Sequence, residues 1–184
     1  MFLALELSAD VREAMGALQR RLREGHGGWR WTRTEGLHLT IRFLGEVDPD
    51  LDARGRPRWA AAAAGVPAFR LRFSRLGRLP PRGRPRVLCV EAEDGEGRAT
   101  SLAERVEQVA HGLGFEPERR RFHPHLTLAR AARGGRPELP ESLGLPHPLE
   151  LSVDALVLLR SQLDPAGARY TMLESFPLAG ARDG

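Results

Sequence analysis

Two short segments of the chain alternate apolar and polar residues and share the tripeptide His-Leu-Thr. In residues 37–43 (LHLTIRF) every second residue is apolar, and in residues 122–130 (FHPHLTLAR) the alternation follows Pro124. A strand tolerates proline only near its start, so this position fits. Because side chains two residues apart in a β-strand point to the same side, each segment predicts a strand with one apolar face and one polar face.

Further elements follow from the periodicity of the rest of the chain. Apolar runs or alternation predict five other strands, at residues 2–7, 69–76, 87–92, 149–160 and 169–174. Apolar residues three and four positions apart predict three helices, at residues 8–23, 48–65 and 98–113. Proline and glycine predict exposed loops at residues 77–86 and 131–148.

The order of these elements repeats. A strand, a helix, a loop and a His-Leu-Thr strand occupy residues 2–41, and the same series recurs over residues 87–128. His38 and His125 are 87 positions apart, which is close to half of the 184 residues. We therefore expect an α+β protein in which a duplicated unit faces its own copy. Strand order and direction do not follow from this pattern alone.

Composition narrows the chemistry. All 28 basic residues are arginine, a bias that a GC-rich genome also produces, and the absence of lysine excludes Schiff-base catalysis and a P-loop. A net charge of +4 favours an anionic partner. The single cysteine, Cys89, excludes an intramolecular disulfide framework, and its apolar neighbours Leu88 and Val90 predict a buried thiol. No apolar run approaches membrane-span length, and residues 1–7 resemble a strand more than a signal peptide, so we expect a cytoplasmic protein.

The polar faces of the two His-Leu-Thr strands suggest a reaction. His38 with Thr40 and His125 with Thr127 would bring two imidazoles and two hydroxyls into one cleft. Two imidazoles can share acid and base work near neutral pH, and hydroxyls can bind phosphate oxygens. Arg130 could neutralise the phosphate only if the strand bends, because strict alternation points it away from Thr127. The set therefore predicts phosphodiester cleavage by positioning and charge stabilisation.

A metal site is the weaker interpretation of the same histidines. His123 and His125 form a His-x-His pair that could chelate a metal from one strand face. A third ligand is missing nearby in the sequence, and Pro124 disturbs the local pairing. We expect neither a metal nor a cofactor.

With these two motifs the sequence resembles the 2H phosphoesterase superfamily. Within it, the sequence is most similar to the bacterial and archaeal RNA 2′,3′-cyclic phosphodiesterases, first called 2′-5′ RNA ligases. The resemblance covers nearly the whole chain. It is carried by FLALEL at residues 2–7, W-x6-HLTIRFLGEV at 31–47, FHPHLTLAR at 122–130 and LLRSQLDPAGARYTMLESFPL at 158–178.

The resemblance implies a bilobal α+β fold, with mainly antiparallel sheets, flanking helices and a central cleft. Residues 1–184 would form one domain of two intertwined lobes related by a pseudo-two-fold axis, one carrying HLT 38–40 and the other HLT 125–127. It further implies that a 2′,3′-cyclic phosphate at an RNA end is opened to a 2′-phosphate without a metal. His125 would be the general base and His38 the general acid, while Thr40, Thr127 and Arg130 would hold the phosphate.

Other residues and partners complete the expectations. Arg42 stands where relatives commonly have lysine, keeps the charge and is a candidate substrate contact. Phe122 is our candidate for stacking on a nucleobase, whereas alternation places Phe43 on the face opposite His38. The expected partners are RNA ending in a cyclic phosphate and also nucleotides. We expect a monomer, because the repeat completes the cleft within one chain. ATP-independent 2′-5′ ligation and an RNA-binding module with little turnover stay open as alternatives.

Overall fold

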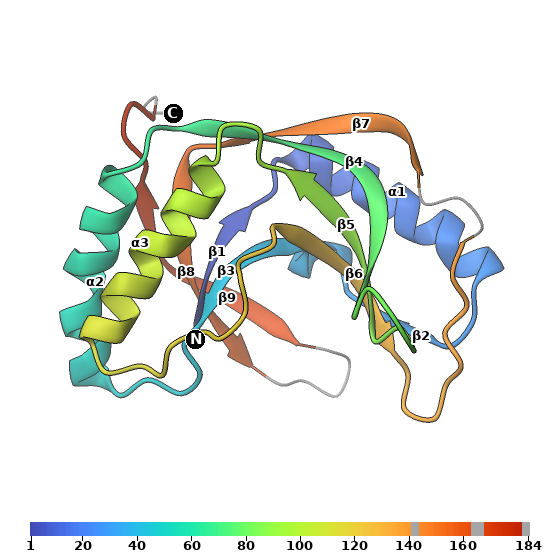
Figure 1. The fold of residues 1–184 in the computed structure, drawn as a ribbon, viewed down its shortest axis with the longest axis horizontal. Helices are drawn as coiled ribbons and strands as arrows, with labels where there is room; N and C mark the ends of the chain where they lie inside the picture. Colours follow the sequence, from blue (N-terminus) through green and yellow to red (C-terminus); the bar gives the residue numbers. More distant parts are fainter. Residues whose placement is uncertain (141–143, 163–167, 182–184) are drawn as a thin grey trace.

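The computed structural model describes residues 1–140, 144–162 and 168–181. In this part of the chain nine strands join in one sheet (Figure 1), namely β1 (Phe2–Glu6), β2 (Trp29–Trp31), β3 (His38–Phe43), β4 (Phe69–Leu79), β5 (Val87–Glu93), β6 (His125–Ala131), β7 (Gly144–Val153), β8 (Ala155–Gln162) and β9 (Arg169–Pro177). The helices are α1 (Ala9–Gly25), α2 (Pro49–Ala64), α3 (Arg98–Gly112) and a short 3-10 turn, η1 (Thr34–Gly36).

The strand order divides evenly at its middle. It is β7-β4-β5-β6-β3-β1-β8-β9, with β2 paired to β6, and all of these named strands pair antiparallel. Four strands of this order therefore lie on each side of the boundary between β3 and β6, the two His-Leu-Thr strands. The prediction of an α+β fold with a repeated unit and antiparallel pairing is confirmed.

Local sequence signals start two of the helices. Asp48 precedes α2 and accepts a hydrogen bond from the Leu51 N–H at 2.8 Å, while Pro49 occupies the first turn, where its missing N–H costs nothing. Asp94 accepts hydrogen bonds from the Ala99 and Thr100 N–H groups in the first turn of α3. These carboxylates also lie favourably in the field of the helix N-termini.

Helices α1 and α3 each cover the half of the sheet opposite to the strand that precedes them in the chain. The first helix, α1, follows β1 but contacts β7, and its buried Gln19 reaches β6. The third, α3, follows β5 but contacts β3, whereas α2 follows β3 and contacts both α3 and β9 (Figure 1). One cluster of buried apolar side chains runs through both halves of the sheet, including Leu39 and Leu126. Separating the two repeats would therefore expose the core of both.

Three sequence predictions need correction. The loop predicted at residues 131–148 ends earlier, because β7 begins at Gly144. The segment 149–160 is not one strand, because it spans the end of β7, the turn at Asp154 and most of β8. The strand predicted to end at residue 76 continues to Leu79, into the predicted loop, because β4 stays paired with β5 as far as Leu79 and Val87. Residues 141–143 and 163–167, which belong to the predicted loop and to the last matching motif, lie outside the described residues.

Gln19 is the buried polar residue that joins α1 to the sheet. It is 3% exposed, and its Nε2 donates to the carbonyls of Thr32 and Leu128, each at 2.9 Å. Its Oε1 accepts from the Thr34 hydroxyl at 3.3 Å. A single carboxamide therefore ties the helix to β6 and to the segment that leads from β2 into β3.

We expect Gln19→Ala to lower the free energy of unfolding by about 1–3 kcal/mol, because it removes the donor from buried carbonyls. Urea unfolding followed by circular dichroism measures the effect, with Arg21→Ala on the exposed face of α1 as the matched control. Equal stability of the two variants would contradict this role for Gln19.

Candidate active site

Four polar side chains meet where β3 and β6 pair. The two strands share one register pair, Leu39 with Leu126, and both leucines are fully buried. Because the pairing is antiparallel, His38 lies beside Thr127 and Thr40 beside His125. All four side chains are on the face away from the leucines. The histidines thus occupy one diagonal of a four-cornered site, and the threonines occupy the other.

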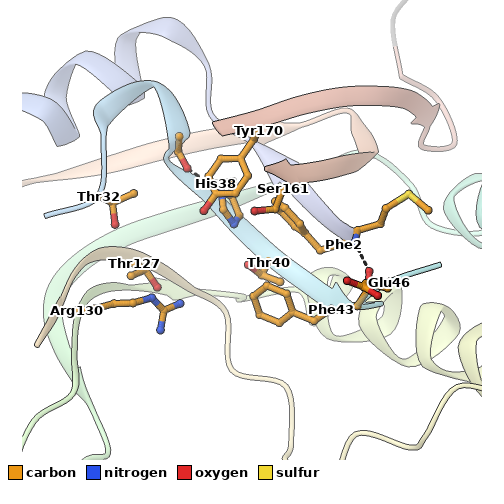
Figure 2. Close-up of a pocket in the computed structure, with 13 residues that line it drawn as sticks. Phe2, Thr32, His38, Thr40, Phe43, Glu46, Thr127, Arg130, Ser161 and Tyr170 are labelled. Carbon is orange, nitrogen blue, oxygen red and sulfur yellow. Dashed lines mark hydrogen bonds between the residues drawn. The ribbon is translucent and has the colours of Figure 1, made fainter. Parts of the chain in front are cut away.

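An open cavity of about 410 Å³ lies over this face (Figure 2). Its lining comes from both repeats, including His38 and Thr40 from β3 and Thr127 and Arg130 from β6. In the described part of the chain His125 is not among the lining side chains, although the strand register puts it next to Thr40. The structure therefore brings the predicted histidine and threonine pairs together. Three of these four side chains, those of His38, Thr40 and Thr127, line the cavity.

A β-bulge turns Arg130 into the cavity. Strand β6 pairs Thr127 with Cys89 and Ala129 with Leu88, so Leu128 is an extra residue on its strand. Such a residue shifts the alternation by one, and Arg130 consequently faces the same side as Thr127. The sequence analysis required a bend in this strand if Arg130 is to neutralise a phosphate beside Thr127. The bulge provides that bend.

Strand β3 carries the equivalent bulge at Ile41. Thr40 pairs with Ala4 and Arg42 with Leu3, which leaves Ile41 without a counterpart. Phe43 therefore projects into the cavity and is 58% exposed, while Arg42 turns to the opposite face. The faces predicted for Phe43 and Arg42 are wrong, because strict alternation holds only in a strand without a bulge. Aligning HLTIRF with HLTLAR would have shown that Phe43 matches Arg130.

The other two predicted substrate contacts are not brought to the cavity. Arg42 is only 12% exposed, and its Nε forms an ion pair with Glu107 of α3 at 2.8 Å. Its guanidinium also donates to the carbonyl of Glu116. Phe122 is half-buried and packs against the hydrophobic core. Arg42 thus joins β3 to α3 and the segment after it, and the aromatic residue at the cavity is Phe43.

Backbone carbonyls hold both imidazoles in the same way. The Nδ1 of His38 lies 2.8 Å from the Gly36 carbonyl, and the Nδ1 of His125 lies 2.7 Å from the His123 carbonyl. A carbonyl can only accept, so Nδ1 must be the protonated nitrogen in each neutral ring. In each case Nε2 is then the nitrogen that can take up or release a proton during a reaction.

Two aromatic rings and a guanidinium surround the first histidine. The ring of Tyr170 contacts the His38 ring edge-on at 4.9 Å between centroids, and Phe2 packs against it at 4.7 Å. Arg12 of α1 donates to the carbonyls of Thr34, Glu35 and Leu37, and so anchors the turn that carries Gly36. None of these residues was predicted as part of the site, although Phe2 lies in the first matching motif and Tyr170 in the last.

Burial and positive charge favour the neutral form of both histidines. Burial is the main cause that lowers the pKa of His38, and the charges of Arg130 and Arg12 act in the same direction. Burial also lowers the pKa of His125, together with His123 and Arg130, whereas the Glu91 carboxylate opposes the shift. In the register Glu91 lies directly opposite His125. A bound anion would favour the protonated form of both imidazoles, because it offsets the positive field.

Neither a metal cluster nor a membrane helix is found in the described ranges. No three His, Cys, Asp or Glu side chains come together there as a possible metal site. The rings of His123 and His125 are stacked 6.3 Å apart between centroids. Within the same ranges, none of the helices has the length and apolar character needed to cross a membrane.

Comparison with known families agrees with this geometry. The family model described as "LigT like Phosphoesterase" matches the chain twice, over residues 5–89 and 90–170. Each match includes one His-Leu-Thr strand. The chain belongs to the LigT-like phosphoesterase family. The double match also confirms the internal repeat, and the predicted resemblance to the 2H phosphoesterases is confirmed with it.

Curated relatives and solved structures extend the match over the chain. A Thermus thermophilus protein named RNA 2′,3′-cyclic phosphodiesterase is 38% identical over 98% of this chain and 90% of its own. A Geobacillus stearothermophilus protein of the same name is 32% identical over the whole chain, which spans 58% of that relative. Crystal structures of a T. thermophilus protein and of E. coli LigT with 3′-AMP superpose with TM-scores of 0.78 and 0.77, at 31% and 25% identity. They cover 98% and 96% of both chains compared.

Arg130 should control the protonation of this LigT-like site. We expect Arg130→Gln to raise the pKa of both His38 and His125, because removing a nearby positive charge favours the imidazolium. Titration of the imidazole protons by NMR measures both shifts, with Arg21→Gln on α1 as the control. A shift of the pKa of one histidine only would contradict an effect of the Arg130 charge on both rings.

Proposed function

We propose that this protein hydrolyses the 2′,3′-cyclic phosphate at an RNA end to a 2′-phosphate. The observation that carries the proposal is the diagonal pair of imidazoles, each with Nε2 available, beside two hydroxyls and Arg130. This set suits the hydrolysis of a cyclic phosphodiester. One imidazole can activate the attacking water, and the other can protonate the ester oxygen that leaves. The names of the curated relatives, RNA 2′,3′-cyclic phosphodiesterase, support the same reaction.

The steps follow from the diagonal arrangement. His125 Nε2 takes a proton from water, whose oxygen attacks phosphorus opposite the 3′ oxygen. The bond from phosphorus to the 3′ oxygen breaks, and His38 Nε2 protonates that oxygen. Thr40 and Thr127 donate to the non-bridging oxygens, while Arg130 offsets their charge. In-line displacement needs an acid and a base on opposite sides of phosphorus, as diagonal histidines provide. The choice of His125 as base rests on the family resemblance.

Phe43 extends the proposed site towards the nucleobase. It lines the same cavity as His38 and is 58% exposed, so its ring is open to a stacking partner. Stacking of a base on its ring would remove that surface from water at little geometric cost. We therefore assign to Phe43 the base contact that the sequence suggested for Phe122.

The remaining expectations belong to the same proposal. We treat residues 1–184 as one catalytic domain acting as a cytoplasmic monomer, since both halves of the site lie in one chain. Nucleotides are further candidate ligands, because solved structures of E. coli LigT contain 3′-AMP, ATP and NADP+. ATP-independent 2′-5′ ligation would use the same groups. A binding module with little turnover would need no acid–base pair, which makes it the weaker alternative.

The first test is hydrolysis of a short RNA that ends in a 2′,3′-cyclic phosphate, with EDTA present. We expect a 2′-phosphate product, and a loss of roughly two to four orders of magnitude in kcat for His38→Ala or His125→Ala. His111→Ala, on the exposed side of α3, is the matched control. Bound RNA without product would instead support the binding module.

A second test separates the acid from the base. A cyclic substrate with sulfur in place of the 3′ oxygen has a leaving group that needs no protonation. We expect this substrate to restore activity to His38→Ala but not to His125→Ala, measured as kcat on the two substrates. Restoration in His125→Ala alone would reverse the two roles.

A further inference from the structure

Two arginines lie directly opposite each other beside the candidate active site. Strand β2 pairs with the end of β6, and its register places Arg30 opposite Arg130. Residues directly opposite in an antiparallel pair point to the same side of the sheet. Since Arg130 lines the cavity, Arg30 must lie on the cavity face as well.

A second observation gives the same orientation. Thr32, two residues after Arg30, lines the cavity, and side chains two positions apart share a face. The flanking tryptophans point the other way: Trp29 is 8% exposed and donates its Nε1–H to the Glu138 carbonyl, while Arg23 stacks over Trp31. Arg30 itself is exposed and is not among the lining residues, so it lies just beyond the rim.

This like-charge pair departs from the pattern elsewhere in the sheet. On β4, three arginines form ion pairs with glutamates of neighbouring strands, Arg70 with Glu150, Arg72 with Glu93 and Arg75 with Glu91. Among the described residues no carboxylate lies within ion-pair distance of Arg30 or Arg130. Like charges directly opposite each other destabilise a sheet, so an anion between or beside them would relieve the repulsion.

We propose that Arg30 binds the phosphodiester on the 5′ side of the terminal nucleotide, and so selects RNA strands over single nucleosides. The inference rests on the proposed function, in which Thr40, Thr127 and Arg130 hold the cyclic phosphate. The next anion along an RNA strand is the phosphodiester at the 5′ carbon of that nucleotide. Arg30 is the guanidinium next to Arg130 on the same face, and guanidinium binds phosphate oxygens in pairs.

The test compares two substrates that differ by this phosphate, a nucleoside 2′,3′-cyclic phosphate and a dinucleotide that ends in the same group. In Arg30→Ala we expect KM for the dinucleotide to rise roughly tenfold, the effect of one charged hydrogen-bonded contact. The KM for the nucleoside substrate should change less than about twofold, and kcat should hold for both. Arg30→Lys should recover part of the loss. The slope of log KM against log salt concentration for the dinucleotide should fall by about 0.7, which corresponds to the loss of one phosphate contact on a single strand.

Arg70→Ala is the matched control, because it removes one arginine from β4, where Glu150 already pairs it. An equal rise in KM for both substrates, a fall in kcat, or no change for either would overturn the role of Arg30. Dissociation constants of both molecules, measured in the His125→Ala background, test Arg30 without turnover. A tenfold loss for the dinucleotide alone would support the second phosphate site even if the hydrolysis proposed above failed.

Discussion

The antiparallel pairing of Leu39 with Leu126 is the contact around which the sheet is organised. Both leucines are fully buried, and four strands extend outwards on each side of this pair. An antiparallel pairing at the middle of two identical tripeptides makes the nearby side chains alternate between histidine and threonine. It therefore produces the diagonal arrangement that the proposed in-line reaction requires. A slip of one residue in either strand would turn the histidine of that strand towards the core.

The two bulges are the second constraint. Each His-Leu-Thr strand has one extra residue after its threonine, Ile41 in β3 and Leu128 in β6, and each bulge turns the sixth motif residue into the cavity. The carbonyl of Leu128 is held by the Thr32 N–H and by Gln19. The contact between α1 and the sheet therefore helps to hold the bulge in β6 in place.

Equivalent backbones carry different side chains in the two repeats. At the sixth motif position one repeat has Phe43 and the other has Arg130, so one side of the cavity is apolar and the other is cationic. A nucleotide has the same asymmetry, with an apolar base at one end and an anionic phosphate at the other. In our proposal the duplicated scaffold supplies the paired acid and base, and the divergence at this position orients the substrate. Arg30 would extend the cationic side along the strand.

The repeat, the His-Leu-Thr strands with their buried leucines and most helix positions could be predicted from the amino-acid sequence, because they depend on periodicity and local signals. The faces that Arg42, Phe43 and Arg130 occupy required the folded chain, since a bulge arises from pairing with β1 or β5 and leaves no mark on the alternation. The same holds for the opposition of Arg30 to Arg130 and the approach of Tyr170 to His38. The last two contacts join segments 100 or more residues apart, and the register of all these strands is set by packing of the whole sheet.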